Sequence, residues 1–151
     1  MPEYTAKIVW ERGSQDFLDK RYSRRHRIEF DGGAELPGSS SPHSVPVPYS
    51  DLSAADPEEM LVAAVSSCHM LWFLALAADQ GFRVDSYVDE PVAVMGKNEL
   101  GFDAIVSIEL RPEIRFEAPA PDGVQLAALH HNAHARCCLA NSVSAEVVVR
   151  E

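Results

Sequence analysis

One segment of the sequence, residues 56–81, limits the fold more than any other. Residues 56–59 read DPEE, an acidic N-cap followed by proline and glutamate, which is typical of a helix start. From Met60 to Ala78 nearly every residue is apolar or small, and residues 79–81 (DQG) end the pattern. A helix that is apolar around most of its circumference has to be covered on several sides, so we expect it at the centre of the fold.

Strand patterns precede this helix. Alternating apolar residues at 4–11 and again at 26–30 predict two strands, and the glycines at 31–33 permit the turn that ends the second. Residues 34–50 are rich in Pro, Ser and Gly and lack periodicity. They predict a long surface loop with a short extended piece at 44–49.

After the helix, the pattern at 83–95 predicts a strand interrupted at Pro91, and 103–116 predicts a second strand. A turn at 97–101 would join the two into an antiparallel hairpin. A second helix over 124–136 and a strand over 144–151 then close the chain.

This order of elements predicts an α+β fold, with an antiparallel sheet packed on long central helices, in a single domain over residues 1–151. One sheet cannot cover so apolar a helix on every side. A second copy of the chain is the simplest cover, so we expect a homodimer.

Charge excludes several classes of partner. The 151 residues include 23 acidic and 13 basic ones, for a net charge of -10. A negative surface repels phosphate backbones and anionic lipids, so we expect no nucleic-acid and no membrane partner. We see no signal sequence, and His, Ser and Asp interrupt the apolar segments before they reach the length of a membrane span, so a cytoplasmic location is expected.

The chain has three cysteines, Cys68, Cys137 and Cys138, which cannot form a closed disulfide framework. A cysteine within an apolar helix is more often an inert core residue than a nucleophile. Cys68 becomes reactive only where a nearby cation stabilises its thiolate, and the arginine-rich stretch at 12–27 could supply one. Adjacent cysteines bridge each other only with strain, so at most one of Cys137 and Cys138 is a partner for Cys68 in a two-cysteine redox cycle.

Histidines offer a rival site. His130 and His134 are spaced i,i+4 on one helix face, as are His134 and Cys138, and with Cys137 they form a set of soft-metal ligands. This pattern supports the alternative of a metal or small-ligand binding protein. No CxxC or HExxH motif accompanies it.

Glu58 has two interpretations. It is either an acid favoured by the positive end of the helix or a base that orients an active-site arginine. Ten residues of straight helix separate it from Cys68 by about 15 Å along the axis. If both residues serve one site, they come from different subunits, or the helix bends.

The run DPEEMLVAAVSSCHMLWFL resembles the OsmC/Ohr family of organic hydroperoxide reductases, in which Asn/Asp-Pro-Glu is followed, ten residues after the Glu, by the peroxidatic cysteine. The segment AHARCCLANSV is similar to the region where the family carries its second cysteine. The amino-acid sequence of residues 22–33 is similar to that of a less characterised branch of OsmC-like proteins.

The resemblance implies a peroxiredoxin-like peroxidase that forms intertwined homodimers and uses no cofactor. It implies that Cys68 attacks the peroxide, that Cys137 resolves the sulfenic acid, and that Glu58 holds an arginine beside the thiolate. Arg24 is the arginine we assign, with Arg21 and Arg25 as neighbours. The implied partners are a hydroperoxide substrate and a thiol or dithiol reductant.

Two further expectations concern substrate and turnover. A wall formed by Trp72, Phe73 and the loop around 46–49 would favour alkyl hydroperoxides over hydrogen peroxide. The last alternative is a redox sensor that keeps the fold and Cys68 but has no steady-state turnover.

Overall fold

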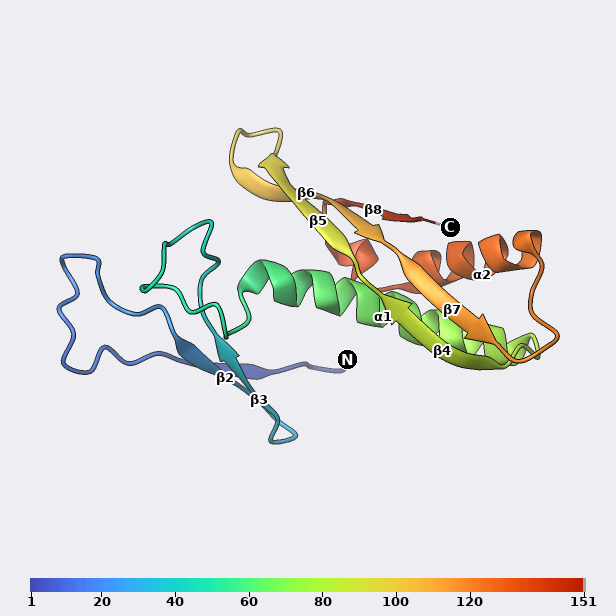
Figure 1. Ribbon diagram of the computed structural model, residues 1–151, viewed down its shortest axis with the longest axis horizontal. Helices are drawn as coiled ribbons and strands as arrows, with labels where there is room; N and C mark the ends of the chain where they lie inside the picture. The colour runs from blue at the N-terminus through green and yellow to red at the C-terminus, as the bar shows by residue number, and fades with distance from the viewer. Residues whose placement is uncertain (151) are drawn as a thin grey trace. The chain divides into compact units, whose positions relative to one another are not determined.

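The computed structural model describes residues 1–150, and the chain forms two compact units, Met1–Met60 and Leu61–Glu151 (Figure 1). The first unit holds three strands, and a long helix begins at its end and continues through the second unit. Together the elements are β1 (Ala6–Val9), β2 (His26–Phe30), β3 (Glu35–Gly38), α1 (Pro57–Asp79), β4 (Val84–Asp89), β5 (Val92–Lys97), β6 (Asp103–Leu110), β7 (Pro112–Phe116), α2 (Gly123–Arg136), the 3-10 helix η1 (Ala140–Ser142) and β8 (Glu146–Val149). The predicted α+β class is confirmed, whereas the single domain stays a prediction.

The first unit is built on an antiparallel sheet in the order β1-β2-β3. Ile28 at its centre is buried and pairs with Ile8 on one side and Leu36 on the other. The turn after β2 contains Gly33 at a φ of 88°, a backbone conformation that favours glycine. Both strands predicted before residue 31 are therefore confirmed.

The prediction of an unstructured loop over residues 34–50 is wrong at its start, where β3 forms. Pro37 within β3 argued against a strand in the sequence. A proline is tolerated on an edge strand, however, at a position that does not have to donate an N–H to the neighbouring strand. Gly38 permits the close approach, since a Cβ there would lie 2.4 Å from Nε2 of His26.

The extended piece predicted at residues 44–49 is also wrong. The backbone turns there, with the carbonyl of Ser41 accepting from the N–H groups of Ser44 and Val45 and the carbonyl of Pro46 accepting from those of Tyr49 and Ser50.

The start of α1 matches the prediction in detail. Asp56 Oδ1 accepts a hydrogen bond from the Glu59 N–H at 2.8 Å, and Glu59 Oε2 accepts from the Asp56 N–H at 3.1 Å, which completes a capping box. The helix runs unbroken to Asp79, and Gly81, at a φ of 81°, follows its end.

The surface of α1 is only partly covered within one chain. Its buried residues form one stripe: Val65, His69, Phe73, Leu76 and Ala77. By length and composition alone the helix could cross a membrane, with a mean hydropathy of 1.9 over its most apolar window. The expectation that His, Ser and Asp interrupt every apolar segment too early is therefore wrong here, because single polar residues barely lower the mean hydropathy of so apolar a run.

In the second unit, the predicted hairpin is confirmed but broken in both strands. β4 pairs antiparallel with β7, and β5 pairs antiparallel with β6. The break at Pro91 has a counterpart at Arg111, which the sequence analysis missed. Asp89 spans it, since its Oδ1 accepts from the Arg111 N–H at 2.7 Å and its other oxygen accepts from the Ser66 hydroxyl on α1.

The closing strand β8 is confirmed, but it pairs parallel with β6 rather than antiparallel. The order of this sheet is β5-β6-β8, separate from the two-stranded sheet β4-β7. The expectation of one antiparallel sheet is therefore wrong in this pair, because the chain passes through β7 and α2 before it returns beside β6.

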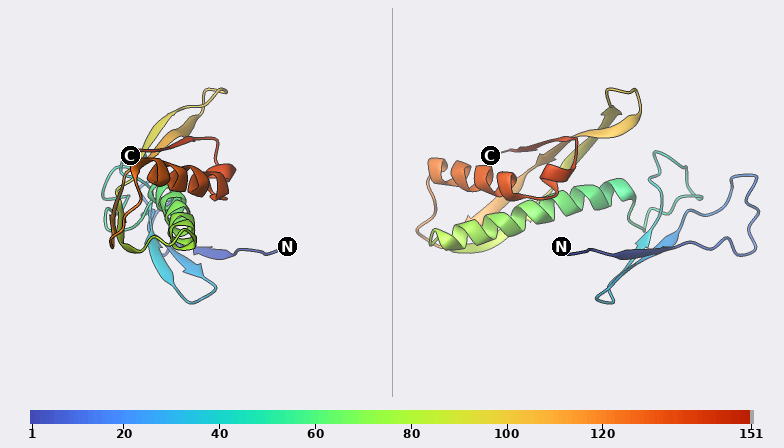
Figure 2. Two further views of the ribbon diagram at one scale, coloured as in Figure 1. Left: turned by 90° about the vertical axis from the view of Figure 1, so that its right-hand side faces the viewer. Right: turned by 180° about the vertical axis from the view of Figure 1, so that it is seen from behind.

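Two apolar clusters hold the second unit together, and both include residues of α1. The course of α1 beside α2 can be followed in Figure 2. Phe73 and Leu76 of α1 pack with Leu129 of α2 against β4 and β7. Val65, two turns earlier, packs with Ile108 and Leu110 of β6. These contacts fix the rotation of α1 about its axis, and therefore the direction in which Cys68 points.

Candidate active site

Three sulfur atoms gather where α1 meets the C-terminal end of α2. Cys68 lies in the middle of α1, Cys137 caps the end of α2, and Cys138 follows it. The Sγ atoms of Cys68 and Cys138 are 3.9 Å apart, and all three cysteines are free thiols.

The backbone around the two C-terminal cysteines is held by η1 and its neighbours. Asn141 Nδ2 donates to the carbonyls of Ala135 and Cys137, each at 3.1 Å, and the Ser142 hydroxyl donates to the Cys138 carbonyl at 2.7 Å. The loop that carries these thiols is thus ordered by hydrogen bonds to its own backbone.

Hydrogen bonds favour the thiolate form of Cys68. Burial, the largest single influence, raises the pKa of this thiol, but donors around the sulfur outweigh it and the pKa of Cys68 is lowered overall. The donors are the backbone N–H of Leu139, the thiols of Cys137 and Cys138 and the backbone N–H of Cys138. A donor that binds the charged form lowers the pKa of an acid, and the thiolate is the nucleophilic form of cysteine.

The other two thiols are shifted the opposite way. Burial, followed by the hydrogen bond to Cys68, raises the pKa of Cys137 to about 11. The hydrogen bond to Cys68 is the main reason that the pKa of Cys138 is raised. Of the three thiols, Cys68 is therefore the one whose thiolate form is favoured, and no cation is among the causes of its lowered pKa.

The rival histidine set is not assembled as a metal site. Among residues 1–150, no three His, Cys, Asp or Glu side chains are arranged to hold a metal ion. Instead His130 faces His69, with Nδ1 of the former 3.1 Å from Nε2 of the latter, and Cys138 faces Cys68. Two members of the predicted set, His130 and Cys138, therefore contact residues of α1.

The histidine pair is buried, with 1% of His69 and 4% of His130 exposed. The His69 ring stacks on that of His130, with centroids 5.4 Å apart, and His130 also contacts the Phe73 ring. Burial, together with the nearby imidazoles of His130 and His134, lowers the pKa of His69 to about 4.

We expect this pair to make the protein sensitive to mild acid. The unfolded chain, in which His69 has its ordinary pKa of about 6.5, binds the proton at a higher pH than the folded chain does. The contribution of neutral His69 is therefore complete above pH 7 and is lost as the pH falls towards 4. The difference between the two pKa values corresponds to a loss of roughly 3 kcal/mol in the free energy of unfolding. Urea denaturation between pH 7.5 and 4 would measure this loss.

The control separates His69 from the carboxylates that also titrate in acid. A His69→Leu variant should lose less stability than the wild type over the same pH range, whereas His131→Gln, a change at an exposed site on α2, should follow the wild type. Parallel curves for His69→Leu and the wild type would show that His69 does not titrate in this range.

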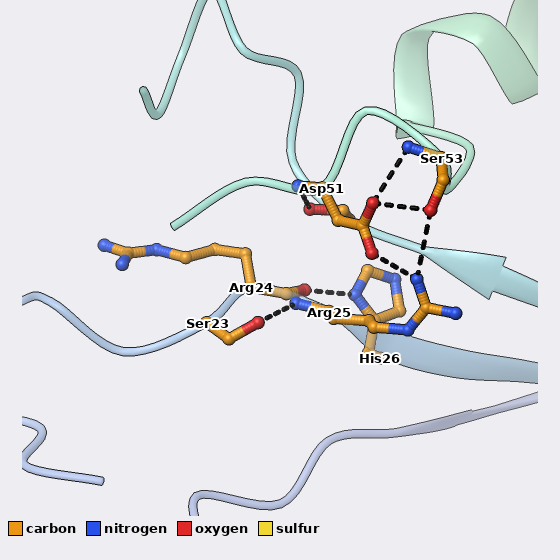
Figure 3. Close-up of polar contacts among 7 residues, drawn as sticks. Ser23, Arg24, Arg25, His26, Asp51 and Ser53 are labelled. Atoms are coloured by element: carbon orange, nitrogen blue, oxygen red, sulfur yellow. Dashed lines mark hydrogen bonds and ion pairs between the residues drawn. The ribbon is translucent and has the colours of Figure 1, made fainter. Parts of the chain in front are cut away.

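The predicted arginine, Arg24, lies in the first unit, just before β2. Its Nη1 donates to the carbonyl of Lys20 at 2.8 Å and to that of Tyr22, and its guanidinium lies 3.8 Å from the centroid of the Tyr22 ring. In Figure 3 the Arg24 side chain extends away from Asp51. Its predicted role beside Cys68 stays a prediction.

The neighbouring Arg25 has a partner that the sequence analysis missed. It forms an ion pair with Asp51 and reaches the Ser53 hydroxyl at 3.5 Å (Figure 3). Hydrogen bonds from Ser53, followed by that from Arg25, lower the pKa of Asp51 to about 2. The spacing Asp-x-Ser at 51–53, typical of an Asx-type turn, was the available signal.

Glu58 occupies the first turn of α1. Its Oε2 is buried and has no hydrogen-bond partner within residues 1–150. Because α1 is unbroken, Glu58 and Cys68 of one chain stay about 15 Å apart along the axis. Both alternatives for placing Glu58 and Cys68 in one site, two subunits or a bent helix, stay predictions.

The two aromatic residues of the predicted wall on α1 have different surroundings, and the role of Trp72 in that wall stays a prediction. Trp72 is partly exposed and lies one turn after Cys68, with the Arg136 guanidinium 5.6 Å from its ring centroid. Phe73 is fully buried in the core instead, because it faces β4 and β7.

Comparisons with known proteins identify the family of the chain. The family model for OsmC-like proteins matches residues 50–151. The solved structure of an OsmC-like protein of unknown function from Vibrio cholerae is 47% identical to this chain, covers 99% of both chains and has a TM-score of 0.97. The chain belongs to the OsmC-like family. The predicted family is thus confirmed.

More distant OsmC-like structures share the fold. An organic hydroperoxide resistance protein from Elizabethkingia anophelis is 16% identical, with 100% of this chain and 97% of that chain covered and a TM-score of 0.70. The organic hydroperoxide resistance protein OhrB of Bacillus subtilis is 18% identical, with 97% and 98% covered and a TM-score of 0.66. No curated protein matches the sequence.

Proposed function

We propose that this OsmC-like protein reduces organic hydroperoxides through the thiolate of Cys68. The observation that carries the proposal is the group of three thiols, in which Cys68 has a lowered pKa and lies 3.9 Å from a second sulfur. A stabilised thiolate beside a second thiol is the arrangement that a dithiol peroxidase requires. The names of the distant relatives, which describe organic hydroperoxide resistance, support the same substrate class.

In the first step, the Cys68 thiolate attacks the terminal oxygen of the hydroperoxide. The S–O bond forms as the O–O bond breaks, and the leaving alkoxide takes a proton to become the alcohol. Cys68 is left as a sulfenic acid, two electrons more oxidised.

In the second step, one of the two C-terminal thiols condenses with the sulfenic acid. The S–S bond forms, the S–O bond breaks and water leaves. An external dithiol then reduces the disulfide by thiol–disulfide exchange and restores both thiols. The family resemblance assigns this second thiol to Cys137.

Arg24 and Glu58 complete the proposed site. The guanidinium of Arg24 would bind the thiolate and the departing oxygen, and Glu58 would hold the guanidinium in place. The buried Oε2 of Glu58 supports this role, because a carboxylate oxygen that has no donor among residues 1–150 is available to one. Since Glu58 and Cys68 of one chain lie about 15 Å apart along α1, the site would combine residues of two subunits.

A second copy of the chain is therefore part of the proposal. α1 leaves apolar side chains uncovered, and Leu71 is 60% exposed within one chain. We expect sedimentation equilibrium to give twice the monomer mass, and a Leu71→Asp variant to shift the protein towards monomer because a charge on that face resists burial. A wild-type monomer at micromolar concentration would contradict the expected homodimer.

The proposed site of action is the cytoplasm. The cycle needs a supply of reduced dithiol, and the three free cysteines match a compartment in which thiols stay reduced.

The function is tested by titrating the reduced protein with substoichiometric cumene hydroperoxide. Each mole of peroxide should remove two moles of free thiol and yield one mole of 2-phenyl-2-propanol. Addition of dithiothreitol should then support continued turnover above its uncatalysed rate. Oxidation that stops after a single cycle would identify a redox sensor, and unreacted peroxide would rule out the peroxidase.

A further inference from the structure

The two cysteines after α2 have different surroundings. Cys137 is fully buried, and its Sγ accepts a hydrogen bond from the Ala140 N–H at 3.3 Å and lies 4.0 Å from the Val65 carbonyl. Its thiol is also hydrogen-bonded to Cys68. Cys138 is exposed, and its Sγ faces that of Cys68 at 3.9 Å. The Cys137 thiol is therefore fixed in the core, whereas the adjacent Cys138 thiol is accessible to solvent.

The geometry points to Cys138, rather than Cys137, as the thiol that resolves oxidised Cys68 and then accepts the attack of the external reductant. This inference rests on the proposed function. A disulfide requires the two sulfurs to approach to about 2.05 Å. Both C-terminal thiols are hydrogen-bonded to Cys68, but they differ in freedom of movement. The exposed Cys138 side chain closes the gap by a small rotation, whereas Cys137 is held in a packed position by its contacts with Ala140 and Val65.

The resolving step needs no reactant other than the Cys138 thiol and the Cys68 sulfenic acid. The Cys138 sulfur attacks the sulfur of the Cys68 sulfenic acid, the S–S bond forms and the S–O bond breaks. The departing hydroxide takes the proton of the Cys138 thiol and leaves as water. The two thiols have then supplied the two electrons that the hydroperoxide received.

Exposure also sets the direction of reduction. An external dithiol reaches the Cys138 sulfur, forms a mixed disulfide there and expels Cys68 as the thiolate. Exchange is faster when the expelled thiol has the lower pKa, and among these thiols that is Cys68. Attack at Cys138 therefore returns Cys68 directly in its reactive form.

Tryptic peptide mapping under non-reducing conditions tests the assignment. Cleavage after Arg136 leaves both C-terminal cysteines on one peptide, so backbone fragmentation between them is needed to locate the link. After substoichiometric cumene hydroperoxide we expect a Cys68–Cys138 disulfide as the first product. A Cys68–Cys137 disulfide that forms first would overturn the inference.

Matched serine variants give a kinetic test. In Cys138→Ser, we expect Cys68 to consume peroxide and remain a sulfenic acid that dimedone traps, with disulfide formation at least tenfold slower than in the wild type. In Cys137→Ser, the Cys68–Cys138 disulfide should still form, and Cys137→Ala serves if the serine variant does not fold. Disulfide formation at the wild-type rate in Cys138→Ser would contradict the assignment.

A second oxidant separates this inference from the proposed function. Diamide oxidises neighbouring thiols without peroxide, so it reports which pair can close. A Cys68–Cys138 disulfide with diamide but no reaction with hydroperoxide would confirm the pairing and refute the peroxidase, whereas a Cys68–Cys137 disulfide with both oxidants would refute the pairing and support the peroxidase.

Discussion

Replacement of Cys68 by serine is expected to lower steady-state reduction of cumene hydroperoxide by at least about a thousandfold, the scale on which removal of a covalent nucleophile acts. A hydroxyl has a far higher pKa than a thiol and cannot form the sulfenic acid on which the cycle depends. The measurement is loss of peroxide with dithiothreitol as the reductant, corrected for the reaction of dithiothreitol alone.

Ser67→Ala provides the matched control. Ser67 precedes Cys68 on α1 and is exposed, so this change removes a hydroxyl beside the thiol without altering the sulfur cluster, and activity should match the wild type. If Cys68→Ser retained a tenth or more of the activity, another group would be the nucleophile.

The second large effect concerns the core. Phe73→Ala is expected to lower the free energy of unfolding by about 3–5 kcal/mol, because it removes a buried ring and leaves a cavity. The Phe73 ring is fully buried and contacts the rings of Tyr87, Phe116 and His130 at centroid distances of 5.6, 6.4 and 4.5 Å. Urea denaturation at a fixed protein concentration should show a lower midpoint with little change in slope.

Phe102→Ala makes the same chemical change where the ring is 67% exposed, at the tip of the β5–β6 hairpin. Its effect should stay within about 0.5 kcal/mol. Equal losses in the two variants would mean that Phe73 does not pack as described.

The parts of the fold that sequence patterns predict are those with local causes. The capping box of Asp56 and Glu59 fixes the start of α1 through contacts three residues apart, and Pro91 breaks a strand at its own position. The sequence analysis missed the edge strand at Glu35–Gly38, because the strand is stabilised by its pairing with β2 and not by its own Pro- and Gly-containing sequence.

The candidate site likewise has one part that local sequence spacing predicts and another part that depends on how the helices pack. The spacing from Glu58 to Cys68 carried the family resemblance, and the family is confirmed. The approach of Cys138 to Cys68 and the His69–His130 pair depend on how α2 packs on α1, since the paired residues are 70 and 61 positions apart. No local pattern states which side of α2 faces α1, so the spacing of the histidines left a metal site open as an alternative.

The donors around Cys68 have a consequence for biosynthesis. All four belong to residues 137–139, which follow Cys68 far along the chain. While the chain is still being made on the ribosome, Cys68 emerges long before these groups do and has the pKa of an ordinary cysteine. The donors that lower the pKa of Cys68 are therefore in place only after residues 137–139 have been made and have folded against α1.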